Sequence, residues 1–476
     1  MSTRFEPCVS IEFDSCTVDE IATLAKDWAL LHGCCLRSRQ NFSTESVEFA
    51  PFLLIPSVFP KKEFDKAVEL QTLFNEMTHR VANNRQFLES TLAAASTVDP
   101  FTARLFQIYK TVQEEGVTQT IDLGLIRNDF MLGADCPNCM SPCCFQLKQV
   151  EINTVASGFA SLGPSVSCLH RFVMQELSHG DKLQQLPENN ALESLCGGIV
   201  KAWEMYNQPL AVILFVESEV THIVSDQRLQ EFEIRRQNPN VKVIHRTLTQ
   251  LGRGAADALD AEKKLIIDGQ EVAVIYFRSG YAPDQYMSAD GCEWDARLMM
   301  ERSKAIKCPS LSYHLTGTKK VQQVLTNPGV LERIFDDDPV KAAKIRNVFT
   351  GLYSLDLDEE GDRAAEMAIQ NPERYVLKPQ REGGGNNVYG KEVGQVLAKM
   401  KGDPVRAGYI LMDVIQPPLL RNWMVRPNNP PVLVDTLSEL GIFGVVIGND
   451  DGILHNSASG HLLRTKIHTC NEGGGI

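Results

Sequence analysis

Residues 377–390 read Leu-Lys-Pro-Gln-Arg-Glu-Gly-Gly-Gly-Asn-Asn-Val-Tyr-Gly, directly after the strand-like pair Tyr375 and Val376. Glycine lets backbone N–H groups approach a ligand without a Cβ in the way. Successive N–H groups in such a turn form a concavity that holds phosphate oxygens, and Lys378 and Arg381 add positive charge. Glu382 would repel a phosphate unless a cation such as Mg²⁺ lies between them. The stretch therefore predicts a flexible loop that closes over a nucleoside triphosphate and carries one metal ligand.

A glycine-rich surface turn is the other interpretation of this stretch. The nucleotide loop is favoured because lysine, arginine and glutamate stand beside Gly-Gly-Gly-Asn-Asn immediately after a strand-like run. The loop is not of the Walker type, because the sequence lacks the pattern Gly-x-x-x-x-Gly-Lys-Ser/Thr.

Length and composition are those of a globular protein with two or three domains, since the chain has 476 residues, 43% hydrophobic and 22% charged. The net charge of −13 argues against a general nucleic-acid binder and against binding to an anionic membrane surface. No run of eighteen apolar residues predicts a transmembrane helix, and the N-terminus lacks the apolar core of a signal peptide. We expect a cytoplasmic protein, with secretion as the alternative if a leader has been removed.

The 13 cysteines are an odd number at scattered positions, which does not indicate a disulfide scaffold. One cluster, Cys136–Cys144, has a spacing that suits metal ligands, but no histidine and no second pair lie at the usual distance. A metal site, a local disulfide in a secreted protein and a thiol-rich surface loop between two strands all remain open for this cluster.

Three short apolar runs, at 209–217, 241–245 and 272–278, are separated by helical stretches. This rhythm is typical of an α/β subdomain with a parallel sheet. Ligands of open α/β sheets gather at the carboxyl ends of strands. Arg278 and Tyr281, which follow the third run, are therefore ligand candidates, although Arg278 could instead pair with an acidic neighbour.

Two further patterns indicate charge chemistry. Glu151 and Asn153 stand two apart on a strand-like segment and so share one face, which suits Mg²⁺, although a solvated strand face would look the same. Lys319 and Lys320 occupy the first turn of a predicted helix, where an anion would favour them. Arg127 is expected at the end of a strand that begins near Leu123.

The remaining periodicity predicts scaffold helices. Apolar residues recur every three or four positions from Lys61 to Ala95, which predicts an amphipathic helix. Residues 340–371 are expected to be helical connectors.

Six blocks of the sequence together resemble the eukaryotic glutathione synthetase family. They are KPQREGGGNN (378–387), EINT (151–154), FRSGY (277–281), GTKKVQQ (317–323), SELGIFG (438–444) and GHLLRTK (460–466). The blocks occur in the family's order from about Leu123 to the end of the chain. The resemblance implies an enzyme, usually a homodimer, that joins glycine to γ-glutamylcysteine using ATP and two Mg²⁺ ions.

The implied fold is α/β with α+β elements: a circularly permuted ATP-grasp fold with an inserted parallel-sheet subdomain and a glycine-rich lid. Residues 1–213 and 326–476 would form the catalytic body with an N-terminal helical scaffold, and the lid would lie at about 352–434 within it. Residues 214–325 would form the substrate-binding α/β subdomain. Both glycine-rich loops, at 383–387 and 473–475, would close over the site, because an acyl phosphate hydrolyses in water.

The resemblance also implies roles for individual residues. The metal ligands would be Glu151, Asn153 and Glu382. The ATP-binding residues would be Glu151, Lys319, Lys378, Gly383, Gly384, Gly385, Asn386, Asn387, Tyr389, Met412, Ile415, Glu439, Lys466 and Glu472. The peptide substrate and reacting carboxyl group would be held by Arg127, Ser157, Gly158, Gln227, Arg278, Tyr281 and Arg464. The catalytic residues would be Lys378, Glu382 and Arg464, the last because a guanidinium offers a rigid donor fork to a tetrahedral intermediate.

The sequence departs from the family pattern near the peptide site. Gly158 stands where the family has a serine, and residues 219–225 place His222 or Ile223 where an asparagine is expected. Beyond Gly473 and Gly474 the family continues with more small residues, whereas this sequence reads Gly475-Ile476. Losing groups that hydrogen-bond a substrate changes specificity.

Three hypotheses remain from the sequence. The first is an active glutathione synthetase. The second is a diverged ATP-dependent carboxylate–amine ligase, such as the secreted glutathione-synthetase-like effectors of plant-parasitic nematodes, with another peptide or amine as substrate. The third is a non-catalytic protein that keeps the fold, which the intact metal and phosphate residues argue against.

Overall fold

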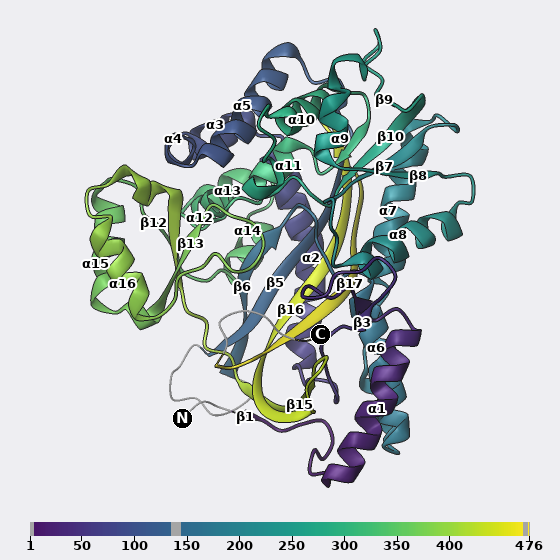
Figure 1. The fold of residues 1–476 in the computed structure, drawn as a ribbon. Helices are drawn as coiled ribbons and strands as arrows, with labels where there is room; N and C mark the ends of the chain where they lie inside the picture. Colours follow the sequence, from purple (N-terminus) through teal and green to yellow (C-terminus); the bar gives the residue numbers. More distant parts are fainter. Residues whose placement is uncertain (1–3, 135–143, 470–474, 476) are drawn as a thin grey trace.

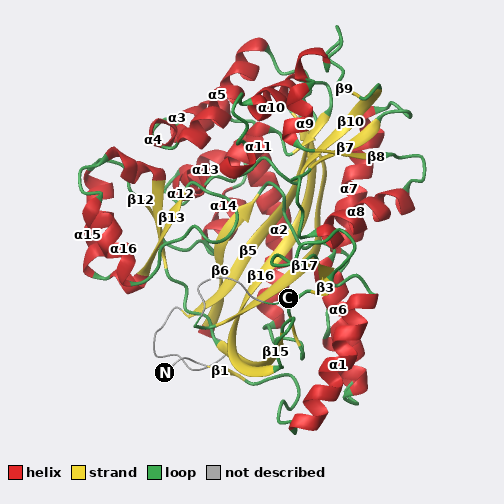
Figure 2. Ribbon diagram, viewed as in Figure 1, coloured by secondary structure: helices red, strands yellow, loops and turns green. Residues whose placement is uncertain are grey.

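The computed structural model describes residues 4–134, 144–469 and 475, and it shows mixed α/β architecture built around a long central sheet (Figure 1). Helices flank this sheet and a second, parallel sheet, while a third, small sheet forms a separate lobe (Figure 2). The predicted α/β class is confirmed. Within the described ranges, no helix is long and apolar enough to cross a membrane.

The central sheet brings together strands that are far apart in the sequence. Its order is β1-β15-β16-β5-β6, with β17 paired to β16 and β4 paired to β15. Its strands are β1 (Arg4–Phe5), β4 (Phe52–Leu53), β5 (Asp122–Ala134), β6 (Phe145–Asn153), β15 (Leu419–Val425), β16 (Val432–Asn449) and β17 (Gly452–Ile467). Because β16 pairs antiparallel with both β5 and β17, residues 432–467 lie beside residues 122–153. Arg127 lies in the middle of β5, so the prediction that it ends a strand is wrong.

Helix α2 (Lys61–Ala82) covers one face of the central sheet. The prediction of one helix from Lys61 to Ala95 is wrong, because the chain breaks at two asparagines. Asn83 donates from Nδ2 to the carbonyl of His79, and the Asn84 side chain accepts from the N–H of Phe87 and caps a new helix. The other helices outside the parallel-sheet region and the small lobe are α1 (Ser15–Leu31), α3 (Arg85–Leu92), α4 (Ala95–Val98), α5 (Pro100–Glu115), α6 (Leu162–Glu176), α11 (Leu311–Thr316), α12 (Lys319–Leu325), α13 (Val330–Ile334) and α14 (Pro339–Arg346).

The predicted parallel sheet is confirmed. Its order is β11-β10-β7-β8, all parallel, with β9 added antiparallel to β10. The strands are β7 (Val212–Val216), β8 (Val243–Arg246), β9 (Ile266–Ile267), β10 (Gln270–Phe277) and β11 (Ile306–Cys308). Helix α7 (Ala191–Tyr206) precedes β7, and the helices between the strands are α8 (Val224–Gln237), α9 (Leu248–Arg253) and α10 (Cys292–Arg302). β7, β11 and most of β10 are buried, as expected of a sheet covered on both faces, whereas the edge strand β8 is largely half-buried.

The third sheet has the order β12-β14-β13 and carries α15 (Glu359–Gln370) and α16 (Lys391–Lys399) on one side (Figure 1). Its strands are β12 (Leu352–Ser354), β13 (Tyr375–Pro379) and β14 (Tyr409–Asp413). It encloses its own apolar core, which includes Leu355, Ala368, Leu377 and Leu411. Residues 340–371 are therefore not wholly helical. A strand of three residues is too short to show a period, and β12 exists because β14 pairs with it.

The N-terminal region adds a short hairpin-like pair, β2 (Cys35–Leu36) with β3 (Glu48–Phe49), next to α1. The Cys136–Cys144 cluster, predicted to lie between two strands, falls between β5 and β6. Residues 135–143 are outside the described residues, but Cys144 is disulfide-bonded, so a disulfide is the interpretation that the structure supports at this residue.

We predict that Gly444→Ala destabilises the protein by about 1–3 kcal/mol, the usual cost of overpacking. A Cβ at Gly444 would lie 2.4 Å from Asn75 Oδ1 and 2.5 Å from Gln71 Nε2 on the buried face of α2. Urea unfolding followed by circular dichroism measures the change. Gly180→Ala is the control, because a Cβ there meets nothing within 4 Å, and it should alter the free energy of unfolding by less than about 0.5 kcal/mol. Equal stability of the two variants would contradict this packing.

Candidate active site

One face of the central sheet collects the charged residues of four strands. In the strand register Arg127 lies opposite Asn153, Asp129 lies opposite Glu151, and Glu439 lies opposite Arg464. Side chains of paired residues point to the same face of a sheet. Lys466, two residues after Arg464, projects to this face by the same alternation. Predicted site residues from 127–153 and from 439–466 therefore lie close together on this face.

Arg127 forms a buried ion pair across this face. Its Nε donates to Asp129 Oδ1 at 2.6 Å and its Nη2 donates to Asp129 Oδ2 at 2.7 Å. The pair lies over Gly441, where a Cβ would come within 2.9 Å of the Arg127 side chain. Asn153 Nδ2 donates to Asp129 Oδ2 at 2.9 Å, so the amide oxygen of Asn153 is the end that remains available to a cation. Arg127 also donates to the carbonyl of Gly158 at 3.1 Å.

Two lysines and two carboxylates meet beside this face, from three separate elements. Lys319, the first residue of α12, donates to both carboxylate oxygens of Glu382 at 3.1 Å and lies 3.4 Å from Glu151 Oε2. Lys378, on β13, lies 3.8 Å from the same oxygen of Glu151 and donates to the carbonyl of Val150. The predicted phosphate and metal residues thus form one cluster that links the central sheet to the small lobe.

The charges in this cluster compensate one another. Burial opposes ionisation of Glu151, but Lys319 and Lys378 lower its pKa to about 2. Burial raises the pKa of Glu382, although Lys319 partly offsets the effect. Burial also disfavours the charged form of Lys319, yet Glu151 and Glu382 raise its pKa above the usual value. Burial lowers the pKa of Lys378. Glu151 and Lys319 are therefore an ionised pair at neutral pH.

Arg464 and Glu439 form a second ion pair on β17 and β16, through Arg464 Nη2 and Glu439 Oε1. Glu439 raises the pKa of Arg464, and burial raises the pKa of Glu439. The Arg464 side chain remains 40% exposed, so its guanidinium has room for a further partner. Lys466 is half-buried and has contacts of its own.

The predicted peptide residues form a neighbouring buried group. Arg278 Nη2 ion-pairs with Asp226 Oδ2 at 3.0 Å, and its Nη1 donates to the Ser157 carbonyl at 3.4 Å. Pairing with an acidic neighbour, one of the two possibilities left open by the sequence, is therefore what Arg278 does. Asp226 also accepts from the N–H groups of Phe159 and Ser161, so one carboxylate fixes the backbone on either side of Ala160. Gln227 is buried in the first turn of α8.

Gly158 leaves open space in this group. A Cβ at Gly158 would lie 3.9 Å from Arg278 Nη2 and 4.0 Å from Asp226 Oδ2, which are ordinary contact distances. The glycine is thus not required by packing. His222, the other departure, turns to the N-terminal region, because its carbonyl accepts from the N–H of Arg37 and its ring packs edge-on against Phe42.

The glycine-rich loop projects from β13 as the predicted closing loop would. Leu377 pairs with Val388, which closes the base of the loop, while Gly384, Gly385 and Asn386 are exposed. Tyr281 reaches the loop, since a Cβ at Gly383 would lie 4.0 Å from its ring. The other predicted residues around the loop are Asn387, which donates to the Tyr389 hydroxyl at 3.2 Å, buried Met412 on β14 and half-buried Ile415 after it. Glu472 lies outside the described residues.

The donor set suits magnesium better than a transition metal. Glu151 and Glu382 converge on one ammonium group and Asn153 directs an amide oxygen to the same face, so the available donors are all oxygens. Mg²⁺ is bound in phosphotransfer sites by one or two carboxylates together with substrate phosphates and waters. Within the described residues, no group of three or more histidine, cysteine, aspartate or glutamate side chains is placed to hold a metal ion.

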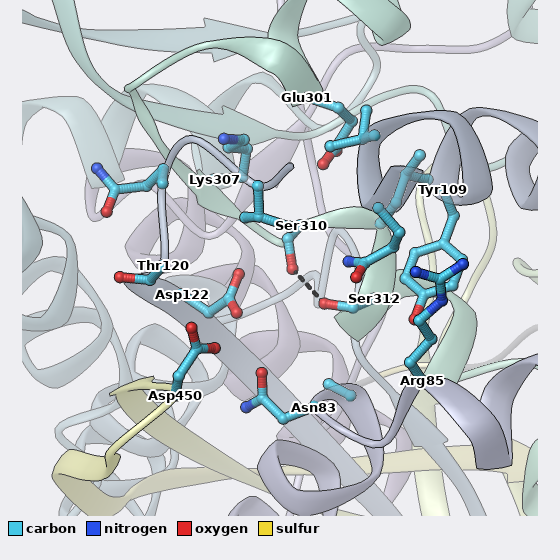
Figure 3. A pocket seen from close by; sticks show the side chains of 16 residues that line it. Asn83, Arg85, Tyr109, Thr120, Asp122, Glu301, Lys307, Ser310, Ser312 and Asp450 are labelled. Atoms are coloured by element: carbon cyan, nitrogen blue, oxygen red, sulfur yellow. Dashed lines mark hydrogen bonds between the residues drawn. The ribbon is translucent and has the colours of Figure 1, made fainter. Parts of the chain in front are cut away.

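A polar cavity of about 180 Å³ lies at the other end of β5 (Figure 3). Asp122 and Asp450 face each other in it, Lys307 lies above them, and Ser310 and Ser312 share a hydrogen bond of 2.9 Å. Burial raises the pKa of Asp122 to about 7. Asp122 precedes Arg127 by five strand residues, roughly 16 Å along β5. None of the residues predicted for the site lines this cavity, so it is separate from the charged cluster.

Sequence reasoning missed Asp129 and Asp226, the acids that hold Arg127 and Arg278. Asp129 stands two residues after Arg127 on the same strand, so the period of two could have identified the pair. No local signal links Asp226 to Arg278, because 52 residues separate them.

Comparison with known proteins gives one consistent result. The family model for the eukaryotic glutathione synthase ATP-binding domain matches residues 15–476. The glutathione synthetase of Homo sapiens is 43% identical over 97% of this chain and 95% of its own length. The chloroplastic glutathione synthetase of Solanum lycopersicum is 39% identical over 97% of this chain and 83% of its own length. A glutathione synthetase-like effector from Globodera pallida, solved in its apo form, superposes with a TM-score of 0.76 at 27% identity and covers 96% of each chain.

We predict that Asp226→Asn lowers the free energy of unfolding by about 3–5 kcal/mol, because it leaves the buried Arg278 without its charge partner. Urea unfolding is the measurement. Glu188→Gln, which breaks an ion pair with Arg171 at a carboxylate that is 93% exposed, is the matched control and should cost less than about 1 kcal/mol. A loss at Asp226 as small as the loss at Glu188 would show that the buried pair does not hold this region together.

Proposed function

Because the chain belongs to the eukaryotic glutathione synthase family, we propose that it joins glycine to the cysteinyl carboxylate of γ-glutamylcysteine at the expense of ATP, giving glutathione. The observation that carries this proposal is the cluster of Lys319, Lys378, Glu151 and Glu382 next to Arg127 and Arg464. It combines the positive charge needed for phosphates with the oxygen donors needed for Mg²⁺.

The proposed reaction has two steps. The peptide carboxylate attacks the γ-phosphorus of ATP, which forms an acyl phosphate and releases ADP. The glycine amine then attacks the acyl carbon, and phosphate leaves the tetrahedral intermediate. A carboxylate is a poor electrophile, and phosphorylation supplies the leaving group. Most of the work that remains for the protein is positioning and charge stabilisation.

Lys319 and Lys378 would bind the phosphates, together with the backbone N–H groups of residues 383–387. Lys319 begins α12, so the helix N-terminus adds to its positive charge. Glu151, Asn153 and Glu382 would hold two Mg²⁺ ions, which when bound would neutralise phosphate charge. The ammonium of Lys319, shared by two carboxylates in the structure, would then turn to the nucleotide. The other proposed nucleotide contacts are Tyr389, Met412, Ile415, Glu439, Lys466 and Glu472.

Arg464 would stabilise the tetrahedral intermediate, because its guanidinium is partly exposed and stands on the sheet face beside Glu151. The peptide would be held by Arg127, Ser157, Gly158, Gln227, Arg278 and Tyr281. Asp129 and Asp226 hold two of these arginines in place, so they are positioning residues.

We assign a separate role to the region around each of the three sheets. Residues 1–213 and 326–476 would be the catalytic body and residues 214–325 the substrate-binding subdomain. The region at about 352–434, which contains the small lobe, would close as a lid, because Glu382 of this region meets Lys319 beside the central sheet. Closure would protect the acyl phosphate from water.

A second candidate function is a diverged carboxylate–amine ligase with another peptide or amine and weak glutathione synthesis. The observation in its favour is the open space at Gly158, beside Arg278 and Asp226. The structural similarity to an effector of Globodera pallida agrees with such divergence.

The deciding experiment measures ADP release with Mg²⁺, ATP, γ-glutamylcysteine and glycine, and identifies the product by mass spectrometry. Rapid ADP release with stoichiometric glutathione supports the first function. ADP release that requires another amine or peptide from a panel supports the second. No ADP release with any acceptor, despite ATP binding, would overturn both.

We predict that Glu382→Gln lowers turnover about 100-fold or more while the protein still folds. Metal ions supply several kcal/mol of charge stabilisation, and each 1.36 kcal/mol changes a rate tenfold. Steady-state kinetics at several Mg²⁺ concentrations measure the effect. Glu392→Gln, an exposed change in the first turn of α16, is the control and should keep normal turnover. Turnover near normal in Glu382→Gln would remove this residue from the metal ligands.

We predict that Gly158→Ser lowers the KM for γ-glutamylcysteine about tenfold. A serine Cβ fits without a clash, and one added hydrogen bond to a charged group contributes about 1.4 kcal/mol. Initial rates at saturating ATP and glycine give the KM, and Gly158→Ala is the matched control without the hydroxyl. The same KM in the serine and alanine variants would show that this position does not contact the peptide.

We also propose a cytoplasmic homodimer. Exposed apolar side chains gather where α1, the β2–β3 region and α8 meet, and Leu31, Phe42, Val220 and Phe232 are among them. Sedimentation velocity should give twice the mass of the chain. Leu31→Asp should shift the protein to monomer, whereas Leu210→Asp, at an equally exposed leucine elsewhere, should not. A monomeric wild-type protein would refute this proposal.

A further inference from the structure

A cavity of about 730 Å³ lies between α6, the first turn of α2 and the strands β16 and β17. Its apolar lining includes Leu53, Phe64, Val166, Met174, Leu440 and Leu463. Figure 1 shows α6 alongside these strands, away from the small lobe. Small-molecule sites have volumes of about 300–1,000 Å³ and mostly apolar walls with a few polar groups. The cavity therefore has the size and the chemistry of a ligand site.

The cavity lies behind the candidate active site. Leu440 pairs with Leu463 in the strand register, one residue away from the pair Glu439 and Arg464. Successive side chains of a strand point to opposite faces. The two leucines therefore line the cavity while Glu439 and Arg464 face the substrates. A ligand in the cavity would touch the strands that position Arg464 without entering the active site.

One buried polar side chain in the lining has no partner. His461 is 9% exposed, and its ring packs edge-on against Phe64 with 5.1 Å between the ring centres. Among the described residues, none forms a hydrogen bond with the ring nitrogens. Burial lowers the pKa of His461 to about 4, so at neutral pH the ring offers one N–H donor and one acceptor. By contrast, His170 in the same lining is satisfied by the carbonyl of Leu53 at 2.8 Å.

The two lysines that line the cavity differ in whether a carboxylate neutralises them. Lys61 pairs with Asp65, the one carboxylate of the lining, at 2.5 Å. Lys182, in the 3₁₀ helix Gly180–Gln185, donates to the neutral carbonyl of Cys8. Within the part of the chain that the structure describes, no carboxylate ion-pairs with Lys182. The cavity thus carries one uncompensated positive charge beside an apolar wall.

We propose that this cavity binds a small amphiphilic carboxylate, with the apolar chain against Leu440 and Leu463 and the carboxylate held by Lys182. His461 supplies a second donor inside the cavity. An anion is favoured over a cation because Lys182 lacks a counter-charge. An amphiphile is favoured over a sugar or a nucleotide because the wall is largely apolar.

The test is calorimetric titration of decanoate into the full chain, first alone and then with saturating Mg²⁺, a non-hydrolysable ATP analogue and γ-glutamylcysteine, which fill the active site without turnover. We expect saturable binding to one site per chain. Lys182→Glu should weaken decanoate binding about tenfold or more, because it replaces attraction by repulsion, while decanol binding should change less than about twofold. Lys242→Glu, at an exposed lysine on another face, is the matched control and should bind decanoate as the wild type does.

Two further variants locate the ligand inside the cavity. Val166→Trp should occupy part of the apolar wall and weaken binding of both decanoate and decanol, and its thermal unfolding shows whether it folds. His461→Gln, with a smaller change in volume, should weaken decanoate binding and serves if the tryptophan variant does not fold. The proposal is overturned if decanoate does not bind, if ATP or γ-glutamylcysteine displaces it, or if the Lys182 variant and a folded cavity variant bind it as the wild type does.

Discussion

The site depends on the contact of the Lys319 ammonium group with two buried carboxylates. Glu151 on β6 and Glu382 after β13 both lie against it, although the two carboxylates are 231 residues apart in the sequence. Two buried carboxylates repel each other strongly at low dielectric, and either would be protonated without a cation. Lys319 removes that repulsion and so holds the small lobe against the central sheet. A divalent ion would satisfy the same two carboxylates, which makes the arrangement suited to exchange between lysine and metal.

The register of the strands in the central sheet places the charged side chains of the site on one face. Arg127, Asp129, Glu151, Glu439 and Arg464 share a face because β16 pairs with β5 on one side and with β17 on the other. Gly441 matters in this surface, since any larger residue would push the Arg127–Asp129 pair off the strand. The opposite face is apolar at Leu440 and Leu463, so two leucines separate a charged site from an apolar cavity.

Local sequence patterns predicted most helices and strands but not which distant segments pair with one another. The parallel sheet, the shared face of Glu151 and Asn153 and the start of α12 at Lys319 followed from period and composition, because these are properties of neighbouring residues. The break at Asn83 and the strand β12 did not follow. The first depends on a capping side chain inside a continuous apolar period, and the second on pairing with β14, which lies about 60 residues later. Long-range pairing also explains why the ion pair of Arg278 with Asp226 could not be predicted, and why the roles of individual residues rest on the family resemblance.

Asp226 holds both the backbone and an arginine of the proposed peptide site. Its carboxylate accepts from two backbone N–H groups and from Arg278, so it fixes the chain around Gly158 and uses part of the charge of the arginine. A substrate carboxylate in the proposed peptide site would therefore have to compete with Asp226 for Arg278. The space at Gly158 is open while the backbone around it is held by Asp226, so in the proposed peptide site a single side chain there would change which peptide fits without disturbing the fold. The charged cluster differs from this position, because Glu151, Glu382, Lys319 and Lys378 hold one another in place.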